Sequence, residues 1–127
     1  MQEGVFEWLE LFESGIPIVN GSEVPFKQLK PISILYAIVS RKTLKGTPEG
    51  GYEPEQKMTR EQALKSYTLD AAYGAFEEDI KGSISVGKLA DFTIYNHDLM
   101  TVDESEILNT EIVMTIFDEQ VVYEKKE

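Results

Sequence analysis

The spacing of apolar residues changes near residue 80, and this change limits the folds that the chain can adopt. Before it, apolar side chains recur at helical intervals, as in Ala63, Leu64 and Tyr67. After it, apolar and polar residues alternate, as in Ile112 and Met114, which is typical of half-buried strands. We therefore predict an α+β fold in which helices come first and strands follow.

Two helical patterns precede residue 45. Residues 5–14 form the first, and Gly15 follows where a left-handed cap is favourable. Pro31 suits the start of the second, and Arg41 and Lys42 are expected in its last turn. Their apolar faces are Val5, Trp8, Leu9 and Phe12 in the first and Ile34, Leu35, Ile38 and Val39 in the second. Between them, residues 16–19 predict a short buried strand.

A third helix should start at Thr59, after a polar loop over residues 45–57. Thr59 and Gln62 form a capping box, in which each side chain accepts a hydrogen bond from the backbone of the other. Lys65 is expected on the outer face. The predicted inner face consists of Ala63, Leu64, Tyr67, Ala71, Ala72 and Phe76.

The alternating region predicts strands around Ile84 and Phe92 and a hairpin of residues 111–117 and 120–125. Asp118 and Glu119 would form its turn. Neither is the glycine that a type I′ turn favours, so the pairing register stays open.

Composition excludes several classes of function. The net charge is −11, from 23 acidic and 12 basic residues, and this negative field disfavours nucleic acid and anionic membrane partners. Cysteine is absent and His97 is the only histidine, so one copy cannot build a zinc site of the usual kind. We expect no cofactor in this chain. An acidic N-terminal segment, with no apolar run near the roughly 18 residues of a spanning helix, indicates the cytoplasm.

Two segments resemble a known enzyme family. Residues 82–98, GSISVGKLADFTIYNHD, resemble the start of the C-terminal β-sandwich tail of metal-dependent amidohydrolases. Residues 15–25, GIPIVNGSEVP, resemble the last barrel strand of these enzymes, which ends in Gly-Ser-Asp-x-Pro. The residues between them are similar to the subgroup of N-substituted formamide deformylases and exoenzyme regulatory proteins.

The resemblance implies the last strand and helices of an amidohydrolase (β/α)8 barrel in residues 1–79 and part of the composite β-sandwich tail in residues 80–127. It also implies that Glu23 stands at the position of the catalytic strand-eight aspartate. That aspartate transfers a proton from a metal-bound water that attacks an amide-type carbonyl. The longer Glu23 side chain displaces the carboxylate, and a misplacement of about 1 Å can cost roughly a hundredfold in rate.

Two functions remain open from this sequence. The chain is expected to be the C-terminal fragment of an amidohydrolase, inactive alone, whose family uses one or two divalent, zinc-like metals. The alternative is a noncatalytic protein-interaction or regulatory module derived from that tail. The expected partners are further copies of the chain, as a homo-oligomer, or the missing N-terminal part of the enzyme, because truncation exposes strand edges and apolar faces.

Three other groups of residues invite functional readings. His97 and Asp98 are neighbours, but adjacent strand residues point to opposite faces and cannot form one site. Lys88 and Asp91 have an architectural interpretation, in which Gly87 adopts a positive φ and Asp91 accepts hydrogen bonds from turn amides. Gly50-Gly51 lacks the surrounding motif of a phosphate-binding loop.

Overall fold

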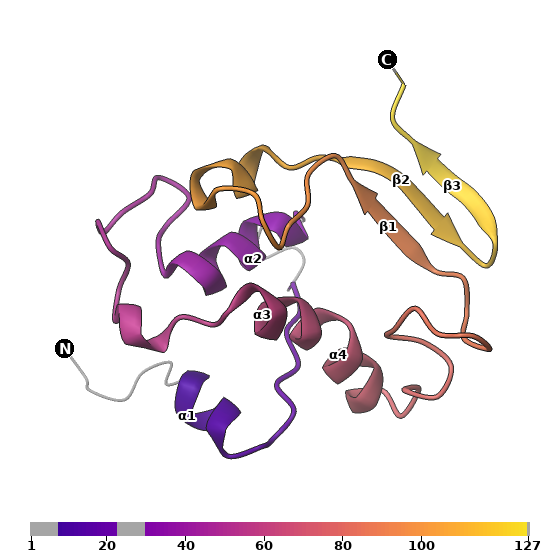
Figure 1. Ribbon diagram of the computed structural model, residues 1–127, viewed down its shortest axis with the longest axis horizontal. Helices are drawn as coiled ribbons and strands as arrows, with labels where there is room; N and C mark the ends of the chain where they lie inside the picture. The colour runs from indigo at the N-terminus through magenta and orange to yellow at the C-terminus, as the bar shows by residue number, and fades with distance from the viewer. Residues whose placement is uncertain (1–7, 23–29, 127) are drawn as a thin grey trace.

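The computed structural model describes residues 8–22 and 30–126 of the chain. These residues form an α+β structure in which helices occupy one end and a three-stranded antiparallel sheet the other (Figure 1). The elements, in chain order, are α1 (Trp8–Glu13), α2 (Pro31–Ser40), η1 (Pro54–Gln56), α3 (Arg60–Tyr67), α4 (Leu69–Gly74), β1 (Phe92–Tyr95), η2 (Glu104–Asn109), β2 (Ile112–Phe117) and β3 (Gln120–Glu124), where η marks a 3-10 helix. The predicted order of helices before strands is confirmed.

The ends of α1 and α2 follow from local sequence. Gly15 has a φ of 77° after α1, as expected of a left-handed cap. Pro31 is the first residue of α2, and Arg41 takes the left-handed cap position with a φ of 57°. Arg41 and Lys42 therefore follow the helix instead of lying in its last turn, which corrects the sequence expectation. The reason is that the Arg41 N–H closes the helix on the Ala37 carbonyl at 2.9 Å.

The capping box at the start of α3 is confirmed. The Thr59 hydroxyl accepts from the Gln62 N–H at 3.1 Å, and the Gln62 side chain accepts from the Thr59 N–H at 2.8 Å. The single long helix that the pattern suggested is interrupted at Thr68, whose φ of −119° and ψ of −85° separate α3 from α4.

The buried face of α3 and α4 matches the predicted one in part. Ala63 and Ala72 are buried as predicted, whereas Leu64 is 38% exposed and Phe76 is 91% exposed. Ser66 and Asp70, which the pattern did not place on this face, are buried as well. Lys65, expected to point outward, forms an ion pair with the buried Asp70. Polar contacts, from Lys65 to Asp70 and from Asn20 to Ser66, thus accompany burial at positions that the apolar pattern does not mark.

The hydrophobic core lies among the helices, between α2, α3 and η2. Leu35 and Val39 of α2 are buried as predicted, and Ile34 and Ile38 are half-buried. The buried core residues are Ile18, Leu35, Tyr36, Val39, Met58, Ala63 and Ile107. Of residues 16–19, only Ile18 is buried, and the segment belongs to no strand. The expected buried strand is therefore wrong, because no strand in the described part of the chain pairs with it.

The sheet has the order β1-β2-β3. The predicted hairpin of β2 and β3 is confirmed, with Phe117 opposite Gln120. Asp118 and Glu119 have φ values of 49° and 62°, so the turn has two left-handed central residues, as type I′ requires, without a glycine. Ile84 is 87% exposed and lies outside the strands, so the expected strand there is wrong.

The hairpin edge β3 lies farthest from the helices and is exposed along its whole length (Figure 1). Among the described residues, no helix is long and apolar enough to cross a bilayer.

Candidate functional site

The segment that leads to Glu23 is fixed to α3 by a polar anchor. The backbone N–H of Asn20 donates to the Ser66 carbonyl at 3.1 Å, and its side-chain amide donates to the Ser66 hydroxyl at 2.8 Å. Ser66 is fully buried and donates its own hydroxyl hydrogen to the Ala63 carbonyl at 2.7 Å. We call this arrangement the Asn20–Ser66 anchor. Its three hydrogen bonds hold the chain against α3 just before residue 23.

Glu23, the candidate catalytic residue, lies outside the described residues, so its role stays a prediction. Neighbouring Ser22 is exposed. The sequence did not reveal the Asn20–Ser66 anchor, because Asn20 reads as an ordinary turn residue and its partner is 46 positions away. The only signal was a serine at an otherwise apolar helical position.

His97 and Asp98 do not form a site. Both side chains are exposed. The Asp98 carboxylate accepts from the Met100 N–H at 2.8 Å and from the Thr101 hydroxyl at 3.0 Å, as an aspartate at the start of a turn does. Within the residues that the structure describes, no cluster of three or more His, Asp or Glu side chains could hold a metal ion.

Lys88 and Asp91 hold the segment between α4 and the sheet. The Lys88 ammonium donates to the backbone carbonyls of Glu78 and Lys81, the latter at 3.3 Å. Asp91 accepts from the backbone N–H of Asp118, in the hairpin turn, at 3.0 Å, and Gly87 has a φ of 93°. The architectural interpretation of this motif is confirmed.

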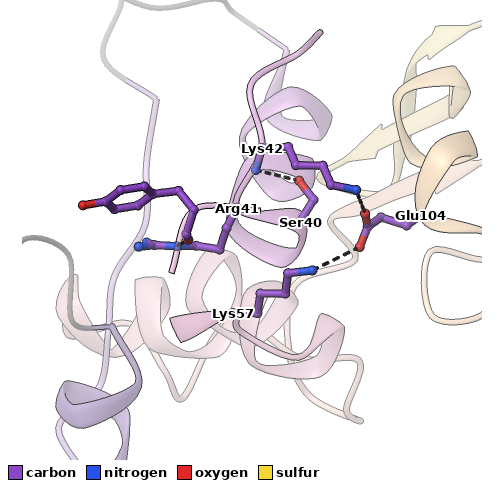
Figure 2. Close-up of polar contacts among 6 residues, drawn as sticks. Ser40, Arg41, Lys42, Lys57 and Glu104 are labelled. Atoms are coloured by element: carbon purple, nitrogen blue, oxygen red, sulfur yellow. Dashed lines mark hydrogen bonds and ion pairs between the residues drawn. The ribbon is translucent and has the colours of Figure 1, made fainter. Parts of the chain in front are cut away.

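A charged cluster joins the end of α2 to η2. Lys42 contacts Glu104 at 2.8 Å and Lys57 contacts it at 3.9 Å, and both side chains point toward that carboxylate (Figure 2). The hydrogen bond from Lys42 lowers the pKa of Glu104, and the same bond raises the pKa of Lys42. The lysines neutralise Glu104, so the cluster acts as a structural tie.

The polar loop after α2 is held by Arg41. Its guanidinium donates to the Tyr52 carbonyl at 2.8 Å and pairs with Glu53 at 3.1 Å. It also stacks over the Tyr52 ring, 5.6 Å from the ring centroid. Within the loop, Pro54–Gln56 form the short helix η1, which the polar composition did not predict.

A groove of about 440 Å³ opens between α2, α3 and the segment leading into β1. Its apolar lining includes Leu35, Leu64, Leu89, Phe92 and Leu99. The Tyr67 hydroxyl is buried beside it and has no hydrogen-bond partner among the described residues, and burial raises the pKa of Tyr67. An apolar groove of this kind can pack against an apolar surface of a partner, but its apolar side chains cannot act as catalytic groups.

Comparison with known proteins gives the family. The amidohydrolase family profile matches residues 1–123. YtcJ of Bacillus subtilis (strain 168), whose name assigns it to the amidohydrolases, is 30% identical over 120 residues, covering 94% of this chain and 23% of that protein. The N-substituted formamide deformylase of Arthrobacter pascens is 26% identical over 121 residues, covering 95% of this chain and 22% of that protein.

The chain thus spans less than a quarter of the length of these relatives. No solved structure shows a significant match. Since the family profile covers nearly the whole sequence, the chain belongs to the amidohydrolase family.

Proposed function

We propose that this chain is the C-terminal portion of a metal-dependent amidohydrolase, which hydrolyses C–N amide-type bonds only when the rest of the enzyme is present. The proposal rests on how much of each protein the alignment covers. The alignment with YtcJ takes in 94% of this chain but 23% of that relative, so most of a complete enzyme has no counterpart here. The isolated chain is then inactive.

In this proposal, residues 1–79 provide the last strand and helices of a (β/α)8 barrel, and residues 80–127 provide part of the composite β-sandwich. The order of helices before an antiparallel sheet supports this division. The bonds of Lys88 and Asp91 agree with a boundary near residue 80, because Lys88 bonds to the carbonyls of Glu78 and Lys81 and Asp91 bonds to the hairpin turn of the sheet.

Glu23 is the proposed counterpart of the proton-transferring aspartate of the family. The Asn20–Ser66 anchor lies three positions before it and would fix the segment that leads to it. A catalytic carboxylate needs such a fixed backbone, because a shift of about 1 Å can cost roughly a hundredfold in rate.

A divalent metal does not fit the residues that the structure describes. Asp98 is engaged in a turn, His97 stands exposed, and no described cluster could supply three ligands. Zinc in catalytic sites is held by about three protein ligands. The proposal therefore assigns the metal ligands to the remainder of the enzyme and routes no step through a metal in this chain.

The uncovered apolar groove lined by Leu64, Leu89 and Phe92 supports the proposal that this chain has a protein partner. In a complete enzyme, the remainder of the polypeptide would cover it. In isolation, a second copy would cover it, which is the basis for the proposed homo-oligomer.

A noncatalytic protein-interaction or regulatory module is the second candidate. The exposed side chains of β3 favour it, because Val121, Val122 and Tyr123 are 55%, 58% and 48% exposed on an unpaired edge. An edge of this kind can accept a strand from a partner.

The isolated chain provides the first test. We expect purified protein, shown to be folded by circular dichroism, to retain no stoichiometric metal after dialysis and to leave an N-substituted formamide unhydrolysed with zinc added. One metal per chain, lost on His97→Ala or Glu23→Gln, together with hydrolysis above the buffer rate, would overturn the proposal.

A further inference from the structure

A second hollow, of about 410 Å³, lies between the start of α2 and the sheet. We call it the α2 hollow. Figure 1 shows the first turn of α2 beside the point where β1 ends and β2 begins. The residues that carry the argument are Lys30, Ile32, Tyr95, Thr110, Ile112 and Lys125.

The start of α2 supplies donors for an anion. The helix has ten residues, and its N-cap residue is Lys30, which makes no side-chain capping bond. Lysine carries no acceptor, so it cannot cap the first-turn N–H groups. The Ser33 N–H donates a hydrogen bond to the Lys30 carbonyl at 3.0 Å, and Pro31 has no N–H. The first turn therefore presents the Ile32 N–H and the positive end of the helix dipole without a side-chain cap.

Thr110 provides an independent observation at the same place. The residue is 6% exposed and lines the α2 hollow, and its hydroxyl has no hydrogen-bond partner among the described residues. Buried hydroxyl groups are almost always paired, since an unpaired one forfeits its bonds to water. The hydroxyl oxygen itself is closed to solvent, so a rotation of the Thr110 side chain about χ1 would be needed to bring it to a ligand oxygen in the hollow, where it would be satisfied.

The charges around the hollow favour an anion. Lys30 lies at one side of it, and Lys125 lines it together with Glu111, with which Lys125 forms an ion pair. This pair is built into the sheet, because the Lys125 N–H donates to the Val113 carbonyl at 2.9 Å and the Glu111 N–H to the Asn96 side chain at 2.8 Å. Two lysines against one glutamate give a local positive excess in a chain of net charge −11.

Apart from Thr115, the remaining lining is apolar or aromatic. Ile112 and the half-buried Tyr95 face each other in the register of β1 and β2, and Tyr123 of β3 also lines the hollow. A bare inorganic anion would leave this surface uncovered.

We propose that the α2 hollow binds a small organic carboxylate. Its carboxylate accepts hydrogen bonds from the Thr110 hydroxyl and the first turn of α2, Lys30 supplies charge, and its apolar body packs against Ile112 and Tyr95. The existence of this site does not depend on amide hydrolysis.

The test is titration of the full chain with benzoate and, separately, with inorganic phosphate, followed by nuclear magnetic resonance and calorimetry. Benzoate should saturate with millimolar affinity and shift resonances of residues around Thr110. Thr110→Val, which keeps the shape and removes the hydroxyl, should weaken binding about fivefold. Lys30→Gln should weaken it as well, whereas the matched control Lys45→Gln, in the exposed loop, should leave it unchanged.

Thr110→Val has a second readout that does not need the ligand. If the hydroxyl is unpaired in the free protein, the variant should melt at a higher temperature than the native chain, because valine loses no hydrogen bond. A lower melting temperature would show that Thr110 is already bonded and would overturn the proposal. Absence of saturable benzoate binding, equal binding by Thr110→Val, or tighter binding of phosphate than of benzoate would overturn it too.

Discussion

Replacing Ile107 by alanine should destabilise the chain more than any change on the exposed side of α3. Ile107 lies in η2 with none of its surface exposed, and it packs in the core with Leu35 and Val39 of α2. Truncation there removes buried carbon atoms and leaves a closed cavity. Such substitutions cost about 2–5 kcal/mol of unfolding free energy.

Leu64→Ala is the matched comparison, because the sequence pattern places Leu64 on the buried face. Leu64 is 38% exposed and borders an open groove. Complete burial of a leucine is worth about 1.5–3 kcal/mol, so the buried part of this side chain accounts for roughly 1–2 kcal/mol. The substitution widens a groove that solvent already enters and adds no closed cavity.

Urea denaturation followed by circular dichroism measures both variants at one micromolar-range concentration, with Lys45→Ala as a surface control. The slope of free energy against urea must be the same for all variants if the midpoints are to be compared. From the centres of these two ranges, we expect the Ile107→Ala midpoint to fall about twice as far as that of Leu64→Ala. Equal shifts, or a larger shift for Leu64→Ala, would refute the assignment of the core.

Four further predictions follow from the described contacts. Ser66→Ala removes the acceptor of the Asn20 amide and should cost about 1–2 kcal/mol in a urea melt; an unchanged midpoint would show that the Asn20–Ser66 anchor carries no stability. The pKa of Glu104 is lowered from its ordinary 4.5, so its contribution to stability is present above that value and is lost as pH falls through the folded-state pKa. The native chain and Glu104→Gln should therefore differ in melting temperature at pH 7 and converge in acid. A difference that stays constant with pH would contradict this. Glu119→Gly relieves a φ of 62° and should stabilise the hairpin by about 1 kcal/mol, and a lower melting temperature would argue against the left-handed turn. Light scattering should report a homodimer or larger assembly at micromolar concentration, because the groove and β3 are uncovered, and a monomer would count against that proposal.

Local signals in the sequence predicted the elements that depend on neighbouring residues. The capping box of Thr59 and Gln62 formed as expected, Pro31 began its helix, and the alternating residues after 111 formed the hairpin. In each case, the interaction that fixes the element joins residues close in sequence, so the pattern alone contains the needed information.

Partners distant in sequence account for what the pattern missed. Ser66 is buried because Asn20, 46 residues away, bonds to it. Ile107 and Met58 enter the core from a 3-10 helix and a loop, where no period marks them. Leu64 has a favourable helical spacing but faces an open groove, so its hydrophobicity did not determine its burial.

The role of Glu23 stays a prediction, because the residue lies outside the described ones. The Asn20–Ser66 anchor shows how the residues just before it are held. The interpretation of Lys88 and Asp91 as architectural was correct, because the motif places a positive-φ glycine and a turn-capping carboxylate in one short segment. Thr110 was not foreseen, since an unpaired buried hydroxyl has no signature in sequence.

The measurement that tests the central claim most directly is hydrolysis by a graft. This chain replaces the aligned 121-residue portion of the Arthrobacter pascens N-substituted formamide deformylase, and the rate is measured on an N-substituted formamide with Glu23 and with Glu23→Asp. If the chain is the C-terminal portion of an amidohydrolase, both grafts should fold, the Glu23 graft should be slow, and the Glu23→Asp graft should be faster by roughly a hundredfold. Folded grafts with equal rates, or hydrolysis by the isolated chain as fast as by the graft, would contradict the account.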